Sequence, residues 1–223
     1  MDGLGINQKI RYGYSKAAQK LGQPFSLYRA LLPDNPIQEL NFVGTINAVT
    51  TIDWQWMKSN KPGNAIFWLV IDGQASSEPL SAIEGDYLVG DSTYFVLTKE
   101  YQMPMSAVQC NAVVNLIRPY QTVEIGNQGY IYYSYADPTT YTSIMISMPI
   151  SILKYTLGSM AGSKLPTDTS QPSFVILMPN LGGVEILIGD IIIDSEGQNY
   201  IILMNEKTKF GWRLAASQQV NTS

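Results

Sequence analysis

Histidine is absent from this chain of 223 residues, and cysteine occurs only once. Without histidine the chain lacks the commonest general base and metal ligand, and Ser-His and Cys-His nucleophile pairs are excluded. The single cysteine, Cys110, excludes an intramolecular disulfide and leaves almost no ligands for structural zinc. It lies in a strand-like apolar run, where we expect a buried and unreactive thiol. We therefore expect no catalytic activity, no cofactor and no metal site.

Charged residues are also scarce, at 14% of the chain, whereas hydrophobic residues make up 45% and include 14 tyrosines and 4 tryptophans. An average soluble domain has about 25% charged residues. Tyrosine, tryptophan and methionine are enriched where protein surfaces become interfaces, so this composition favours an oligomer. A tyrosine-rich β-protein with half-buried rings is the alternative interpretation.

The few charges are divided unevenly along the chain. Residues 1–29 hold five basic side chains and one acidic one, a net charge of +4, while residues 30–223 hold 9 basic and 17 acidic ones, a net charge of -8. An acidic body repels phosphate, so we do not expect it to recognise duplex DNA by sequence. The basic arm suits either DNA or an acidic neighbour.

Long apolar runs are missing as well. The N-terminus lacks the continuous apolar core of a signal peptide, and the longest apolar runs elsewhere have the length of a strand. We therefore expect no membrane segment, and synthesis in the cytoplasm.

One helix is predicted, over residues 6–21. An apolar stripe of Ile6, Ile10, Tyr14, Ala17 and Leu21 recurs at helical spacing, and Gly22 and Pro24 then end the helix. The lysines fall largely off the apolar stripe, which fits either a solvated basic face or docking on a partner. The residues that we assign to partner docking are Ile6, Lys9, Ile10, Arg11, Tyr14, Lys16, Lys20 and Leu21.

One pattern occurs twice, 104 residues apart. Gly85-Asp86 starts an apolar strand that is followed by a turn and a second apolar strand, and Gly189-Asp190 starts the same succession. Glycine permits the tight backbone and aspartate can accept hydrogen bonds from the turn amides, so we interpret all four as structural turn residues. Each copy is followed downstream by a strand that carries arginine, Arg118 in one and Arg213 in the other.

Short strand candidates separated by turn signals predict a mainly β chain. We expect two antiparallel β-barrel or sandwich-like domains, preceded by one N-terminal amphipathic helix. The predicted division is residues 1–30 for the helix and arm, 31–125 for the first β-domain and 126–223 for the second. The polar segment from Gly158 to Pro172 is expected to be either disordered or an extended loop that reaches a neighbouring subunit.

A function of another class stays open at this point. Trp54 and Trp56, together with the many tyrosines, suit the stacking surface of a glycan-binding receptor module. A glycosidase needs only two carboxylates, so the lack of histidine does not exclude glycan cleavage. Packing of both tryptophans within the first β-domain is the simpler interpretation.

Several segments resemble structural proteins of tailed bacteriophages and prophages. These segments are Ile6–Ile10, Lys16–Arg29, Gly85–Val89, Cys110-Asn111, Arg118-Pro119 and the stretch from Gly189-Asp190 to Leu214. The repeated Gly-Asp pattern is also similar to the small β-barrels of head-completion and tail-joining proteins. This chain differs in having two such units and a basic helix in front of them.

The resemblance implies a virion structural protein, made in the host cytoplasm, that forms a homo-oligomeric ring or collar at the head–tail junction, the neck. Its implied partners are further copies of itself, the portal or other neck and tail proteins, and DNA that passes through the channel without sequence specificity. A tail-tube, tail-terminator or baseplate component is the alternative within this class.

Overall fold

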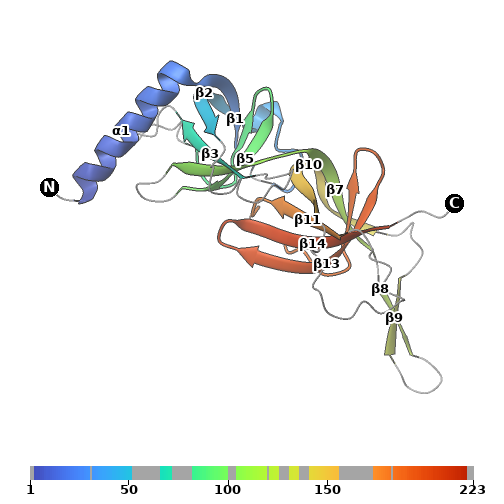
Figure 1. Cartoon of the computed structure of the whole chain (residues 1–223). Helices are drawn as coiled ribbons and strands as arrows, with labels where there is room; N and C mark the ends of the chain where they lie inside the picture. Colours follow the sequence, from blue (N-terminus) through green and yellow to red (C-terminus); the bar gives the residue numbers. More distant parts are fainter. Residues whose placement is uncertain are drawn as a thin grey trace.

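A computed structural model describes residues 3–30, 32–51, 66–71, 82–99, 104–119, 121–125, 131–135, 141–155, 173–181 and 183–219 (Figure 1). Trp54, Trp56 and the segment 158–172 lie outside the described residues.

The chain begins with one helix, continues through strands, and has one short 3-10 turn between the first two strands. The elements are α1 (Gly3–Leu21), β1 (Gln23–Tyr28), η1 (Glu39–Asn41), β2 (Phe42–Thr51), β3 (Ile66–Ile71), β4 (Tyr87–Val89), β5 (Thr93–Thr98), β6 (Met105–Gln109), β7 (Ala112–Pro119), β8 (Gln121–Ile125), β9 (Ile131–Tyr135), β10 (Tyr141–Tyr155), β11 (Ser173–Met178), β12 (Ile191–Asp194), β13 (Asn199–Thr208) and β14 (Gly211–Gln219).

Twelve of these strands close into two antiparallel barrels of six strands each. The first barrel has the order β1-β2-β3-β6-β5-β4, and the second, read from β7, has the order β7-β10-β11-β14-β13-β12. Strands β8 and β9 form a separate two-stranded sheet (Figure 1). The prediction of a mainly β chain with two antiparallel barrels behind one N-terminal helix is confirmed.

Both barrels have the same topology. In each, the first three strands are neighbours in chain order, the last three return in reverse order, and the first strand closes the barrel by pairing with the fourth. The Gly-Asp pattern occupies the same place in both, immediately before the fourth strand, β4 in one barrel and β12 in the other. The sequence repeat therefore marks a repeat of the whole barrel.

The strands are divided between the barrels at a different point from the predicted domains. Strand β1 belongs to the first barrel although it lies within the predicted arm, 1–30. Strand β7 closes the second barrel although it lies within the predicted first domain, 31–125. The two closed sheets thus divide between Gln109 and Ala112, because β7 pairs with β10 and β12, which lie further along the chain.

Side chains alternate between the two faces of each strand, and in the first barrel both the inner face and the face toward the second barrel are apolar. Tyr94 and Val96 of β5 lie in the core of the first barrel, whereas Phe95 between them faces the other way and packs with the second barrel. This follows from the two-residue period of side chains along a strand. Both faces of β5 are therefore buried.

The two barrels share one continuous apolar cluster. Tyr87, Phe95 and Val108 stand on neighbouring strands of the first barrel and are fully buried against the core residues of the second. The Tyr87 hydroxyl donates a hydrogen bond to the carbonyl oxygen of Pro149, at 3.0 Å. Because such a cluster excludes water, the barrels are held together as one unit.

Gly85 and Gly189 take up the left-handed backbone that the turn requires, with φ of 89° and 92°. A Cβ atom added at Gly85 would meet nothing within 4 Å, so the effect of a side chain there would come from the backbone alone. We expect Gly85→Ala to lower the free energy of unfolding by about 1–2 kcal/mol, measured by chemical denaturation.

The matched control is Gly13→Ala in the exposed middle of α1, where a Cβ also meets nothing within 4 Å. Alanine favours a helix by roughly 0.5–1 kcal/mol over glycine, so this variant should be more stable than the wild type. If both variants were equally stable, the turn would not depend on the glycine backbone.

Candidate interaction surface

Each barrel holds one buried carboxylate that binds an arginine. Arg29 donates to Asp86 through Nε at 2.9 Å and through Nη2 at 2.8 Å. Arg118 donates to Asp190 through the same two atoms, at 2.8 Å and 2.9 Å. Both aspartate side chains are 2% exposed, while the arginines are 30% and 34% exposed. These bidentate hydrogen bonds raise the pKa of both arginines, against the opposing effect of burial.

The same carboxylates also organise the turn before the fourth strand. Asp86 Oδ2 accepts a hydrogen bond from the Ile83 amide at 2.9 Å, and Asp190 Oδ2 accepts one from the Leu187 amide at 2.8 Å. Each aspartate thus connects the turn before the fourth strand with an arginine at or just after the end of the first strand of the barrel. Such a buried pair, fully hydrogen-bonded, specifies how the barrel closes.

An arginine lies downstream of each Gly-Asp copy, Arg118 in one and Arg213 in the other, but neither binds the aspartate of its own copy. The partner precedes each aspartate in the chain, because the first and fourth strands pair: Arg29 directly follows β1, and Arg118 is the last residue but one of β7. Arg213 instead forms an exposed ion pair with Glu206, in which Nη1 of the arginine lies 3.9 Å from Oε2 of the glutamate. The sequence feature that could have indicated these ion pairs is an arginine near the end of an alternating strand, 57 residues before Asp86 and 72 residues before Asp190.

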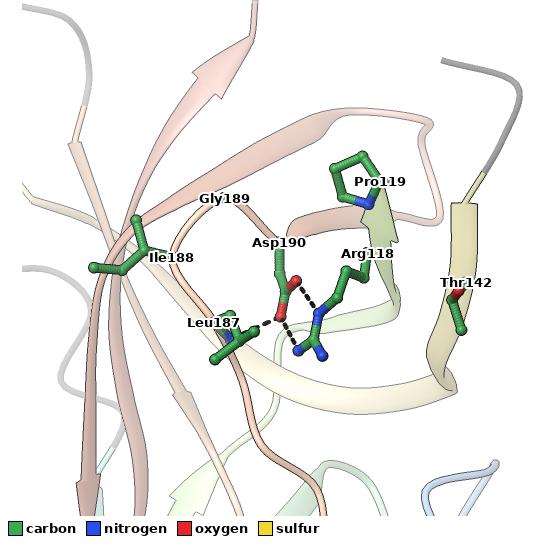
Figure 2. Close-up of a pocket in the computed structure, with 7 residues that line it drawn as sticks. All are labelled: Arg118, Pro119, Thr142, Leu187, Ile188, Gly189 and Asp190. Carbon is green, nitrogen blue, oxygen red and sulfur yellow. Dashed lines mark hydrogen bonds and ion pairs between the residues drawn. The ribbon is translucent and has the colours of Figure 1, made fainter. Parts of the chain in front are cut away.

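A recess of about 220 Å³ opens beside the second of these pairs (Figure 2). Its lining combines apolar side chains with the Arg118–Asp190 pair; the residues are Arg118, Pro119, Thr142, Leu187, Ile188, Gly189 and Asp190. Figure 2 shows the guanidinium of Arg118 turned toward Asp190, so the charge at the recess is already compensated. The recess offers mainly apolar contact area, and its two charged side chains are engaged with each other.

Cys110 lies apart from the recess, at the junction of the two barrels. Burial raises the pKa of the Cys110 thiol, which packs at the edge of the cluster between the barrels and is therefore kept as the unreactive thiol. Within the described ranges, no group of three or more His, Cys, Asp or Glu side chains is placed to hold a metal ion. In the same part of the chain, no helix has both the length and the apolar character needed to cross a membrane.

Helix α1 packs on the first barrel through small and polar side chains. Ala18, Ser15 and Asn7 are its buried residues, and α1 contacts β2 and β3. A Cβ on Gly22 would lie only 3.0 Å from the backbone nitrogen of Ala48, so the chain passes close to β2 where the helix ends. Because small residues allow this close approach, they form the buried face of the helix.

The apolar stripe lies beside this buried face and is only partly covered. Ile6 is 40% exposed and Leu21 is 76% exposed, while Ile10, Tyr14 and Ala17 are half-buried. Lys9, Lys16 and Lys20 are exposed next to the stripe. An exposed apolar stripe bordered by cations is the arrangement expected of a surface that docks on an acidic, partly apolar partner.

Arg11 differs from the other residues assigned to docking. It is half-buried and lies near Lys99 of the first barrel, whose pKa is lowered first by burial and then by the charge of Arg11. The exposed part of the assigned surface consequently consists of Ile6, Lys9, Lys16, Lys20 and Leu21, with Ile10 and Tyr14 at its edge. We call this set the α1 surface.

Comparisons with protein-family models, with curated proteins and with solved structures found no match to this chain.

Proposed function

We propose that this chain is a structural subunit of a tailed-phage virion that assembles with further copies of itself into a ring or collar at the head–tail junction. The observation that carries the proposal is the α1 surface, where Leu21 remains 76% exposed on a helix that the first barrel holds in place. The segments that resemble phage structural proteins give the class of assembly.

Two features of the body support a structural role. The barrels are closed, and they are joined by an apolar cluster in which Tyr87 and Phe95 are fully buried. A subunit of this kind presents fixed surfaces to its neighbours and loses little conformational entropy on assembly. The portal or other neck and tail proteins are the further partners that we propose.

The net charge of -8 on residues 30–223 suits a channel through which DNA passes. A negative wall repels phosphate and therefore does not hold the duplex. The three exposed lysines of the α1 surface are then available for protein partners.

The position of the protein in the virion tests the proposal. An antibody against the chain, or a tag, would be located by electron microscopy on purified particles. A label at the head–tail junction supports the neck ring. A label at the distal tail would favour a tail or baseplate component, and a protein absent from particles would overturn the virion proposal. Glycan binding that is lost in Trp54→Ala or Trp56→Ala would favour the receptor module.

Reversing the charge of the α1 surface should impair assembly. In the triple variant Lys9→Glu, Lys16→Glu and Lys20→Glu, like charges would face an acidic partner, which costs several kcal/mol in an interface. We expect incorporation into particles, measured by quantitative blotting of purified virions, to fall by about tenfold or more.

A triple variant on the second barrel provides the control. Lys154→Glu, Lys207→Glu and Lys209→Glu change the net charge by the same amount at exposed positions far from α1 in the sequence. Incorporation should then stay near that of the wild type. An equal loss in both triple variants would mean that net charge, and not the α1 surface, limits assembly.

A further inference from the structure

The loop between β1 and β2 exposes a second apolar surface with the opposite charge. Leu40 is 92% exposed, Leu32 is 69% exposed and Phe42 is 46% exposed. Asp34 and Glu39 are exposed beside them, and residues 30–51 contain no lysine or arginine. We call residues 32–42 the β1–β2 loop. A large apolar side chain that is nearly fully exposed in a loop with exposed acids is unusual for a surface that faces only water.

The β1–β2 loop is held in one conformation. Asn41 Nδ2 donates to the carbonyl oxygen of Pro36 at 3.1 Å, and Asn35 Oδ1 accepts from the amide of Ile37 at 2.9 Å. Phe42 packs edge-on against the ring of Tyr28, with 5.6 Å between the centroids. A preorganised loop loses little entropy when it binds, so the exposure of Leu40 is not a consequence of a loose backbone.

The β1–β2 loop and the α1 surface lie on different sides of the first barrel. The Pro33 carbonyl oxygen accepts a hydrogen bond from the amide of Ile146 in β10, which places the loop beside the second barrel. Helix α1 ends close to Ala48 of β2, and six strand residues, about 20 Å, separate Ala48 from Phe42. Figure 1 shows the N-terminal end of α1 on the side of the first barrel away from the second.

The two surfaces are complementary in charge and both are apolar. Three exposed lysines border the α1 surface, and two exposed acids border Leu40. Opposite charges at the rim of an apolar contact fix its register and discourage wrong partners. Because the two surfaces are separated on the first barrel of one chain, we expect them to meet between copies.

We propose that the α1 surface of one copy docks on the β1–β2 loop of the next copy, with the exposed apolar side chains of the loop, Leu40 above all, packing along the apolar side chains of α1 and with Asp34 and Glu39 facing the lysines. This contact rests on the proposed function, since it is how the ring would be built. Two different surfaces of the same chain form a head-to-tail contact, which closes into a ring when the rotation between copies allows it.

Self-association of the purified full-length chain tests this contact, measured by sedimentation velocity over a range of concentrations at low salt. Leu40→Ser removes the apolar centre of the contact, and we expect the dissociation constant to rise by about tenfold or more. Leu203→Ser is the matched control, because Leu203 is 56% exposed on β13 of the second barrel. It should leave the dissociation constant unchanged, and circular dichroism should show that both variants are folded.

Reciprocal charge changes test the pairing of the two surfaces. The lysine triple variant of α1 and the double variant Asp34→Lys, Glu39→Lys should each associate more weakly with itself, by about tenfold. In a mixture of the two variants both contacts between unlike chains are favourable, because the acidic α1 surface meets the basic loop and the basic α1 surface meets the acidic loop. The chain that carries all five changes should associate nearly as well as the wild type. Higher salt should weaken the wild-type contact, since the rim charges are screened.

Three results would overturn the contact: a wild-type chain that stays monomeric, a Leu40→Ser variant that associates as well as the wild type, or no recovery in the five-fold variant. If all the variants still associate and the antibody or tag locates the protein at the head–tail junction, the ring proposal stands but this contact is not its interface. If the variants show that α1 pairs with the loop but the protein is absent from virions, the contact is supported and the proposed function is wrong.

Discussion

Asp190→Ala is expected to lower the free energy of unfolding by about 3 kcal/mol, because removing one member of a buried ion pair leaves the other charge without its partner. Asp190 is 2% exposed and accepts two hydrogen bonds from Arg118 and one from the amide of Leu187. Nε of Arg118 and the Leu187 amide lose this acceptor, while Nη2 of Arg118 keeps its hydrogen bond to the carbonyl oxygen of Glu185 at 2.8 Å. Water reaches the guanidinium of Arg118, which is 34% exposed, so the expected value lies at the lower end of the range for buried pairs.

Denaturation by guanidinium chloride, followed by circular dichroism, measures this change. Glu206→Ala provides the control, because the pair of Glu206 with Arg213 is more than half exposed on both sides. Exposed pairs contribute about 0–1 kcal/mol, so this variant should be close to the wild type. Equal effects at Asp190 and Glu206 would contradict the structural role of the buried carboxylate.

Phe95→Ala should destabilise the chain by about 3–5 kcal/mol, as expected when a fully buried aromatic side chain is truncated. Phe95 has no exposed surface and contacts the core of the second barrel although it belongs to the first. Its ring also packs with Tyr87, at 6.2 Å between centroids. The cavity would therefore form between the barrels and weaken the contact that joins them.

The rate at which a thiol reagent modifies Cys110 measures how often the contact between the two barrels opens. Cys110 is the single cysteine of the chain and packs against the same cluster, where burial raises the pKa of its thiol. A thiol reagent should modify Cys110 slowly in the wild type and much faster in Phe95→Ala. Phe42→Ala, at a ring that is 46% exposed, should change neither the stability by more than about 1 kcal/mol nor the labelling rate. A labelling rate that is unchanged in Phe95→Ala would mean that the barrels stay joined without this ring.

The repeated Gly-Asp pattern was visible in the sequence because its residues are neighbours in the chain. The backbone of Gly85 and Gly189 and the turn contacts of Asp86 and Asp190 are local, so the residue types alone indicate them. Arg29 was missed as the partner of Asp86, since 57 residues separate them and only the pairing of β1 with β4 brings them together. Strand β7 was placed in the first domain for the same reason, as barrel closure depends on distant pairing.

Helix α1 illustrates a different limit of sequence reasoning. The apolar period from Ile6 to Leu21 predicted the helix, and the structure contains it. Periodicity does not tell which of two adjacent faces meets the barrel, and here the small residues Ser15 and Ala18 do so. The exposure of Leu40 was likewise not predictable, because it depends on hydrogen bonds within the β1–β2 loop.

The closure of both barrels has a consequence for how copies of the chain can join. A closed sheet leaves no row of unpaired amide and carbonyl groups, so neither barrel can gain a strand from a neighbour without first opening. Contacts made by the barrels must then proceed through side chains and loops, whose contacts change with each substitution, while backbone pairing depends little on sequence. Closure thereby prevents edge-to-edge aggregation of the barrels, and which chain they bind depends on a few surface residues.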